Sequence, residues 1–174
     1  VVVGDFDEAQ VRDVIEDAFG DWVSPHGFER IGTNFFDPPP QDIEIETPDK
    51  ANGILFVRQN LELRDTDPDY GALLIAGEMI GGGFMNSRLI RRIREKEGLS
   101  YAVQAIISGH PVDPSGQFIA VAIFAPENVD KVEAALIEEL EKVIEDGFTQ
   151  DELDAATQGW LESKQLGRAQ DGNL

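Results

Sequence analysis

The chain has 174 residues, a length that suits one domain, or one domain with a fragment of another, and that can bury a real core. Its formal net charge of −20 argues against a nucleic-acid partner, because such binding depends on Lys and Arg side chains that neutralise phosphates. The absence of Cys excludes disulfides, thiolate zinc sites and a cysteine nucleophile. No apolar run approaches the roughly 18 residues that cross a bilayer, so we expect no membrane insertion.

The first 22 residues predict one β-α unit. Val1–Val3 form a short β-like run that ends at Gly4, and Asp5 or Asp7 can cap the helix that follows. The apolar side of this helix carries Val11, Val14, Ile15 and Ala18 at helical spacing. Residues 23–41 then contain several glycines and three consecutive prolines, which cannot continue a helix or a central strand. We predict that they form a largely extended linker.

Two strands are predicted after this linker. Ile43 and Ile45 alternate with acidic residues across residues 42–47, which is the pattern of a strand with one face in water. Residues 53–61 are more continuously apolar, and they predict a strand that is buried more deeply.

A helix and a glycine-rich loop come next. Asp67 is predicted to be the N-cap and Pro68 the first helical residue of a helix that ends near Ile80. The three residues that follow are Gly81, Gly82 and Gly83. Consecutive glycines permit positive φ angles and a close approach of the backbone, so we predict that they stop the helix and form a loop.

The stretch from Asn86 to Tyr101 predicts a second helix that stops sharply and becomes a strand. Asn86 or Ser87 can accept hydrogen bonds from the first free amides of this helix. Gly98 is placed as the glycine that ends it, and Arg94 lies in its last turn, where a cation meets the negative end of the helix dipole. Arg94 and Tyr101 therefore flank the turn and could project towards the same side.

The last third of the chain predicts a hairpin and two helices. Residues 99–108 and 117–124 are strand-like segments on either side of a run of turn formers, so they predict an antiparallel hairpin. A long helix is predicted over about 127–146, with Val129, Val132, Leu136, Leu140, Val143 and Ile144 on its apolar side. Thr149 and Glu152 form a capping box for the final helix. The order of elements predicts an α+β fold, a mainly antiparallel sheet with helices layered on one face.

The central motifs also resemble those of a known family. Three glycines, then Ser-Arg-Leu, then Arg94 followed seven residues later by Tyr101 within Arg-Glu-Lys-Glu-Gly-Leu-Ser-Tyr resemble the C-terminal half of the pitrilysin/insulinase family of zinc peptidases, which includes the mitochondrial processing peptidases. The resemblance covers nearly the whole chain. It implies that residues 1–22 close a preceding domain, that 23–41 are the linker, and that 42–174 are a substrate-side C-terminal peptidase domain truncated at its end.

The resemblance implies roles for several residues. In that family, an Arg and a Tyr at this spacing reach into an active site whose zinc is held by the N-terminal half through an inverted His-x-x-Glu-His motif. Arg94 would supply charge and a rigid fork of donors, and Tyr101 a neutral donor, both suited to a peptide carbonyl oxygen that becomes an oxyanion. Residues expected to bind substrate or order the loop are Gly81, Gly82, Gly83, Ser87 and Arg88. For Arg88, ordering of the loop is the preferred role.

On spacing alone, plainer structural interpretations apply to the same residues. Arg94 could be a cation at a helix end, and Tyr101 a strand aromatic in the core. Arg91 and Arg92 are predicted to lie on a solvated helix face with salt bridges to the abundant carboxylates. Only the family resemblance favours the catalytic interpretation of Arg94 and Tyr101.

This chain is not expected to hold zinc. Its only histidines are His26 in the linker and His110 in the hairpin loop, and neither has a second His at the spacing of a helical ligand pair. We therefore expect this fragment alone to be inactive, with zinc present in the complete enzyme. The zinc-bearing N-terminal half, in the same polypeptide or in a partner subunit, and a peptide substrate are the expected partners.

Two alternatives remain open at this stage. The chain could belong to a non-catalytic scaffold that shares the fold, or to a peptide-binding module that acts as the non-catalytic partner of a separate zinc subunit. The family analogy also suggests a bacterial periplasmic protein. The charge and the lack of Cys permit that compartment but do not decide it.

Overall fold

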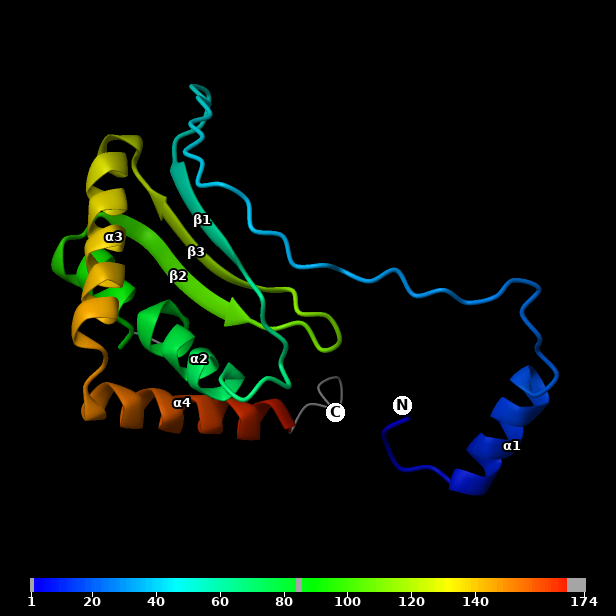
Figure 1. Cartoon of the computed structure of the whole chain (residues 1–174). Helices are drawn as coiled ribbons and strands as arrows, with labels where there is room; N and C mark the ends of the chain where they lie inside the picture. The colour runs from blue at the N-terminus through cyan, green and yellow to red at the C-terminus, as the bar shows by residue number, and fades with distance from the viewer. Residues whose placement is uncertain (1, 84–85, 169–174) are drawn as a thin grey trace. The chain divides into compact units, whose positions relative to one another are not determined.

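A computed structural model describes residues 2–83 and 86–168 (Figure 1). Val1 of the predicted first strand, Phe84 and Met85 of the predicted loop, and residues 169–174 of the predicted C-terminal domain lie outside the described residues. The chain divides into two compact units, Val1–Gly32 with Ser163–Leu174 and Thr33–Glu162. The domain boundaries inferred from the sequence, after residues 22 and 41, stay a prediction.

The first unit contains the predicted N-terminal helix. Helix α1 runs over Glu8–Phe19, and the Asp7 carboxylate caps it by accepting the N–H groups of Ala9 at 2.9 Å and Gln10 at 3.1 Å. None of the residues of α1 is buried. The prediction of a strand at Val1–Val3 is wrong for the described residues 2 and 3, because they pair with no neighbouring strand.

The second unit is built on a three-stranded antiparallel sheet in the order β1-β3-β2 (Figure 1). Its strands are β1, Gly53–Leu61, β2, Ser100–Ser108, and β3, Gly116–Phe124. The central strand β3 pairs with β1 on one side and with β2 on the other, so the predicted hairpin is confirmed.

The predicted strand over residues 42–47 is absent. The segment forms no strand, and Ile43 and Ile45 are 71% and 78% exposed. Alternating apolar residues favour a strand only where they have an apolar surface to cover and an edge to pair with. Residues 42–47 pair with no strand in the described structure, so their isoleucines remain in water.

Part of the linker is held against the second unit before it reaches that segment. The backbone N–H of Thr33 donates to the buried Asp113 carboxylate at 2.7 Å. The Asn60 side-chain amide donates to the carbonyl of Phe36 at 2.8 Å. These two anchors place the start of the second unit at Thr33.

The helix before the glycine-rich loop begins later than predicted. Helix α2 spans Tyr70–Gly77 with Asp69 at its N-cap, and it continues as the π-helical segment η1, Glu78–Gly82. The prediction that the three glycines stop the helix and form a loop is therefore wrong for Gly81 and Gly82, which are helical, and only Gly83, at the C-cap with φ of −70°, leaves the helix. Asp67 was expected to cap this helix. Its carboxylate instead accepts the N–H of Arg64 at 2.8 Å and the guanidinium of the same residue at 3.1 Å. The Asp67 carboxylate thus binds both the backbone and the charged side chain of Arg64, and the ion pair adds Coulomb attraction that the helix amides would not supply.

The second helix ends as predicted. It contains the π-helical segment η2, Ile90–Lys96, and its end is closed by a hydrogen bond from Leu99 N–H to Ile93 O at 2.9 Å. Gly98 has φ of +63°, a left-handed conformation that suits glycine. The chain therefore turns abruptly from η2 into β2.

Two helices follow β3, and the second of them extends past Glu162, the last residue of the second unit. The short 3₁₀ turn η3, Pro126–Asn128, leads into α3, Val129–Asp146, and α4 covers Gln150–Arg168. The predicted capping box is confirmed, because the Glu152 carboxylate accepts the Thr149 N–H at 2.8 Å and the Thr149 hydroxyl accepts the Glu152 N–H at 3.3 Å. The apolar side of α3 is narrower than predicted, since Val129 is 43% and Ile144 84% exposed.

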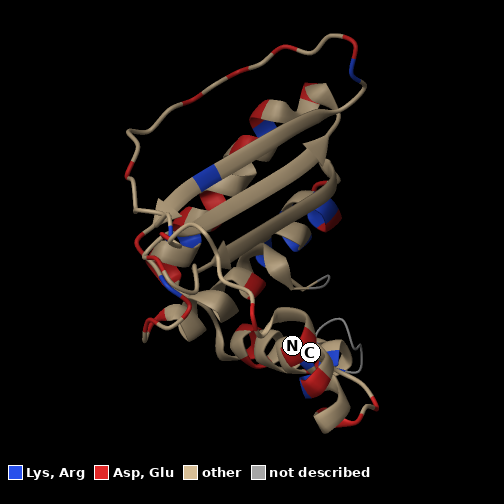
Figure 2. Cartoon of the chain, turned by 90° about the vertical axis from the view of Figure 1, so that its right-hand side faces the viewer, with Lys and Arg blue, Asp and Glu red and all other residues tan. Residues whose placement is uncertain are grey.

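The core lies between one face of the sheet and the helices. The largest fully buried side chains come from β3, from the second helix and from α3, and they include Phe124, Leu89, Ile93, Leu136 and Val132. Figure 2 shows acidic residues spread over the helices and the linker, whereas the strands carry little charge. Arg58 is the one charged residue in the three strands. Within the described parts of the chain, no helix is long and apolar enough to cross a membrane.

Candidate functional site

The glycine-rich stretch is pressed against strand β2. A Cβ atom on Gly81 would lie 2.5 Å from the Ala105 backbone nitrogen and 2.7 Å from its Cβ. Gly77, one turn earlier, also faces β2, because a Cβ on Gly77 would lie 3.1 Å from the nitrogen of Ile107. Gly81 is therefore required for close packing of η1 on the sheet.

The next two glycines face the helix that precedes them. Gly83 donates its N–H to Glu78 O at 2.8 Å, and a Cβ on Gly83 would lie 2.9 Å from that oxygen. A Cβ on Gly82 would lie 3.2 Å from the Glu78 carboxylate. The roles of Gly82 and Gly83 in substrate binding or loop order stay predictions.

Ser87 does not act as the predicted side-chain cap. It is 2% exposed, and its hydroxyl has no hydrogen-bond partner among residues 2–83 and 86–168. Its backbone carbonyl accepts the N–H of Arg91 at 3.0 Å. The residue therefore joins the helix through its main chain, while its small side chain is enclosed by the surrounding structure.

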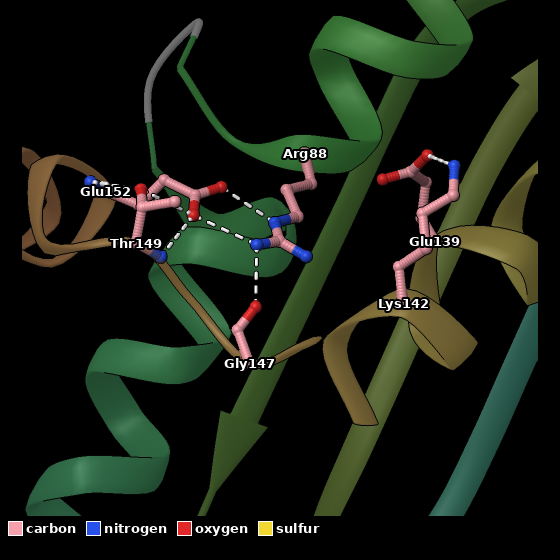
Figure 3. Close-up of polar contacts among 6 residues, drawn as sticks. All are labelled: Arg88, Glu139, Lys142, Gly147, Thr149 and Glu152. Carbon is pink, nitrogen blue, oxygen red and sulfur yellow. Dashed lines mark hydrogen bonds and ion pairs between the residues drawn. The ribbon is translucent and has the colours of Figure 1, made fainter. Parts of the chain in front are cut away.

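Arg88 joins the start of the second helix to the junction between α3 and α4 (Figure 3). Its guanidinium contacts the Glu152 carboxylate through two hydrogen bonds, Nε to Oε1 at 2.7 Å and Nη2 to Oε2 at 2.9 Å. It also donates to Gly147 O at 2.7 Å and lies 5.0 Å above the ring of Phe148. We call Arg88, Gly147, Thr149 and Glu152 the Arg88 clasp.

The Arg88 clasp is a positioning feature. The side chains of Arg88 and Glu152 are only 16% and 20% exposed, so neither is free to reach a substrate in this arrangement. By fixing the residue that follows Asn86 and Ser87, the clasp anchors the C-terminal end of the glycine-rich stretch. The predicted role of Arg88 in loop order stays a prediction, and the clasp supplies a physical route to it.

The clasp shifts the titration of its carboxyl group. The hydrogen bonds from Arg88 lower the pKa of Glu152 from 4.5 to about 2, and those from Thr149 act in the same direction. Burial acts in the opposite direction but is outweighed. Glu152 therefore stays ionised in the folded chain at acidities that would protonate it in the unfolded chain.

Glu152→Gln is expected to lower the free energy of unfolding at pH 7 by about 1.5–3 kcal/mol, the usual range for hydrogen bonds to charged groups. Because folding lowers the Glu152 pKa, its contribution is fully present above the unfolded pKa of about 4.5 and is lost as pH falls towards about 2. Urea unfolding of the wild-type chain and the variant between pH 2 and pH 7 measures the difference between their free energies of unfolding. The titration of carboxylates that both proteins share cancels in this difference. A difference that is constant over this range would contradict the assignment.

Arg92 is held more firmly than its predicted place on a solvated face implies. Its guanidinium approaches Glu97 at 2.6 Å, Glu138 at 2.8 Å and Glu139 at 3.9 Å, and its side chain is 21% exposed. The predicted salt bridges are present. The prediction that Arg92 lies on a solvated face is wrong, because carboxylates of α3 and of the helix end surround its side chain. Arg91 is exposed, as predicted.

Arg94 and Tyr101 both lie at the surface. Arg94 is exposed on η2, and Tyr101 is 66% exposed at the start of β2. The alternative that placed Tyr101 in the core is therefore wrong. The two side chains flank the turn at Gly98, and no hydrogen bond joins them to each other in the described structure. Both can donate to a group that is not part of the described chain.

The described residues do not make a zinc site. No group of three His, Cys, Asp or Glu side chains in the described ranges is arranged to hold a metal ion. His110 uses its Nδ1 to accept the N–H groups of Val112 at 3.1 Å and Asp113 at 2.8 Å, so this nitrogen is engaged in the hairpin loop. The donor set therefore does not fit zinc.

Sequence comparisons place the chain among peptidase-like proteins. The family model described as the peptidase M16 inactive domain matches residues 1–159. A protein named as an uncharacterized zinc protease of Streptomyces coelicolor is 36% identical over 112 residues, covering 64% of this chain and 24% of that protein. A protein named as a probable inactive metalloprotease of Bacillus subtilis is 26% identical over 153 residues, covering 87% of this chain and 34% of that protein. The chain thus spans about a quarter to a third of these curated relatives.

A comparison of structures agrees on the fold. The crystal structure of a protease from Helicobacter pylori matches with a TM-score of 0.78 over 98% of this chain and 41% of that chain. The sequence identity in this match is 18%, so the likeness concerns the fold alone.

Proposed function

Because the chain belongs to the peptidase M16 family, which is the pitrilysin/insulinase family, we propose that it forms the substrate-binding C-terminal portion of a zinc metalloendopeptidase. The observation that carries the proposal is the exposure of Arg94 and Tyr101 on the two sides of one sharp helix-to-strand turn. Two donor side chains that make no hydrogen bond to each other are available for a peptide.

In this proposal the two side chains act on a substrate carbonyl oxygen. The Tyr101 phenol donates one hydrogen bond, and the Arg94 guanidinium adds charge and further donors. Their stabilisation grows as that oxygen gains negative charge in the transition state, so it lowers the barrier more than it strengthens substrate binding. Neither group is suited to produce the attacking nucleophile.

Zinc and the general base would come from outside this chain, in the same polypeptide or in a partner subunit. The donor set of the described residues, which does not fit zinc, supports this part of the proposal. We propose that the peptide lies between this domain and the zinc-bearing half. The fragment alone would then be inactive.

A second candidate function is a non-catalytic subunit or scaffold with the same fold. It is favoured by the Bacillus subtilis relative, which is named as a probable inactive metalloprotease. The full-length sequence discriminates the two candidates. A His-x-x-Glu-His motif in the same polypeptide supports a fused enzyme, its presence only in a neighbouring gene supports a heterodimer, and its absence from both supports a scaffold.

Tyr101→Phe tests the catalytic proposal. In the complete enzyme this change removes one donor and keeps the ring, so we expect kcat to fall about 10²-fold with a smaller change in KM. Single-turnover cleavage of an extended peptide measures the effect, with zinc content checked in each variant. Cleavage at the wild-type rate with wild-type zinc would remove Tyr101 from the catalytic machinery.

Two further variants serve as comparisons. Arg94→Lys keeps the charge but loses the planar fork, so it should not retain full activity. Arg91→Ala changes an exposed cation on the same helix that has no proposed contact with substrate, and it should leave kcat close to wild type. If Arg91→Ala lowers kcat as much as Arg94→Lys does, Arg94 has no special role on this helix and its assignment to the substrate oxygen is wrong.

A further inference from the structure

Tyr101 is exposed to solvent, although the alternation of side chains along β2 would place it on the buried face. Val103 and Ala105, two and four residues later in β2, are 6% and 1% exposed on the face covered by helices. Side chains at every second position of a regular strand share a face, so an undistorted β2 would direct Tyr101 into the same buried layer. Its exposure of 66% therefore requires a local distortion of the strand.

The distortion is a β-bulge centred on Tyr101. Ser100 pairs with Phe124 and Ala102 pairs with Ile123, so β2 advances by two residues where β3 advances by one. Tyr101 is the extra residue and has no partner across the ladder. Such a bulge turns a side chain away from the direction that a regular strand would give it.

We infer that Ser100 is a positioning residue that holds this bulge and thereby aims Tyr101 out of the protein. The inference rests on the proposed function only for its catalytic consequence. Ser100 is 8% exposed, and its Oγ lies 2.6 Å from Ala102 O and 2.8 Å from Ile123 O. Its hydroxyl proton is shared between a carbonyl of the bulged strand and a carbonyl of the facing strand.

These contacts lie where the ladder is interrupted. A bulge leaves backbone groups without regular partners, and a buried carbonyl without a donor is costly. The Ser100 hydroxyl supplies that donor from inside the bulge. Asn128, at the start of α3, supports the same place by donating to Leu99 O at 3.3 Å. The bulge is thus held by a side chain of β2 and by one from the helix layer.

Removal of the hydroxyl should release the bulge. In Ser100→Ala the two carbonyls lose their side-chain donor. The bulged pairing is then no longer more stable than a regular ladder of β2 on β3. A regular ladder would carry Tyr101 towards the helix-covered face. Ser100→Thr keeps the hydroxyl, and β-branched residues are favourable in strands, so this variant should preserve the exposed tyrosine.

The orientation of Tyr101 can be measured directly in the whole 174-residue chain. The sequence contains two tyrosines, Tyr70 and Tyr101, so labelling with 3-fluorotyrosine gives two ¹⁹F resonances that Tyr70→Phe assigns. A neutral gadolinium chelate in solution should broaden the Tyr101 signal of the wild-type chain strongly. We expect most of this broadening to be lost in Ser100→Ala and to be retained in Ser100→Thr.

A second pair of variants keeps the test decisive if Ser100→Ala is too unstable to study. Ser100→Thr and Ser100→Val have nearly the same shape and differ in the hydroxyl. Loss of the broadening in Ser100→Val alone supports the inference. Equal exposure of Tyr101 in both folded variants would overturn it.

Kinetics of the complete enzyme separate this inference from the proposed function. Ser100→Ala should lower kcat about 10-fold or more with little change in KM, because a misplaced donor costs transition-state stabilisation, and Ser100→Thr should restore it. If Tyr101→Phe retains full activity, the proposed function fails whatever Ser100 does. If Tyr101→Phe is impaired while Ser100→Ala leaves both the exposure of Tyr101 and kcat unchanged, only the role of Ser100 fails.

Discussion

Leu136→Asp is expected to unfold the Thr33–Glu162 unit. Leu136 is 2% exposed in the middle of α3, in the core between the helices and the sheet. A carboxylate there would be buried without a partner, at a cost on the order of 5 kcal/mol, comparable with the whole stability of a small domain. Far-ultraviolet circular dichroism and thermal unfolding of the 174-residue chain measure the effect.

Ile144→Asp is the matched control on the same helix. Ile144 was predicted from helical spacing to share the apolar side of α3, yet it is 84% exposed. The same substitution there should change the melting temperature little. If Ile144→Asp unfolds the chain as Leu136→Asp does, the buried side of α3 is wrongly assigned.

Local signals in the sequence predicted much of this fold. The capping box at Thr149 and Glu152 and the left-handed Gly98 depend on a few neighbouring residues, and both are observed. The hairpin of β2 and β3 was also predictable, because two strand-like runs are separated by a short segment of turn formers.

The errors arise where the outcome depends on distant partners. Residues 42–47 have the pattern of a strand but pair with no strand in the described structure, and Asp67 has the pattern of a cap but binds Arg64. Helical spacing cannot show how wide the buried side of α3 is, so Ile144 was placed on it, although only its neighbour Val143 packs against the core. In each case the residue pattern was correct, and its tertiary surroundings decided the result.

The residues of the candidate site also divide into those that local sequence motifs predict and those that depend on distant contacts. Arg94 and Tyr101 were found through a family motif, and the structure leaves both exposed. The bulge that exposes Tyr101 cannot be recognised in the sequence of β2, because Tyr101, Val103 and Ala105 follow each other at every second position, as in a regular strand. The contact between Arg88 and Glu152 joins residues 64 positions apart, so spacing along the chain could not reveal it.

Gly81→Ala is the second variant with a large expected effect. Its new Cβ would lie 2.5 Å from the Ala105 nitrogen, a backbone atom in a paired strand that cannot move aside without disturbing β2. We expect a loss of about 3 kcal/mol, as for overpacking in a dense core, and a fall in melting temperature of roughly 6–12 °C. Thermal unfolding of the 174-residue chain checks both values.

Gly71→Ala provides the control and separates two roles for Gly81. Gly71 lies in α2, where an added Cβ meets nothing within 4 Å, so alanine should leave stability unchanged or raise it by up to about 1 kcal/mol. The family resemblance predicts that Gly81 binds substrate or orders the loop, whereas its packing on Ala105 predicts a structural requirement. If Gly81→Ala melts at the wild-type temperature but raises KM in the complete enzyme, close approach of a peptide backbone is what requires glycine there. If it destabilises the chain as the 2.5 Å contact predicts, the glycine holds η1 against β2, the strand that carries Tyr101.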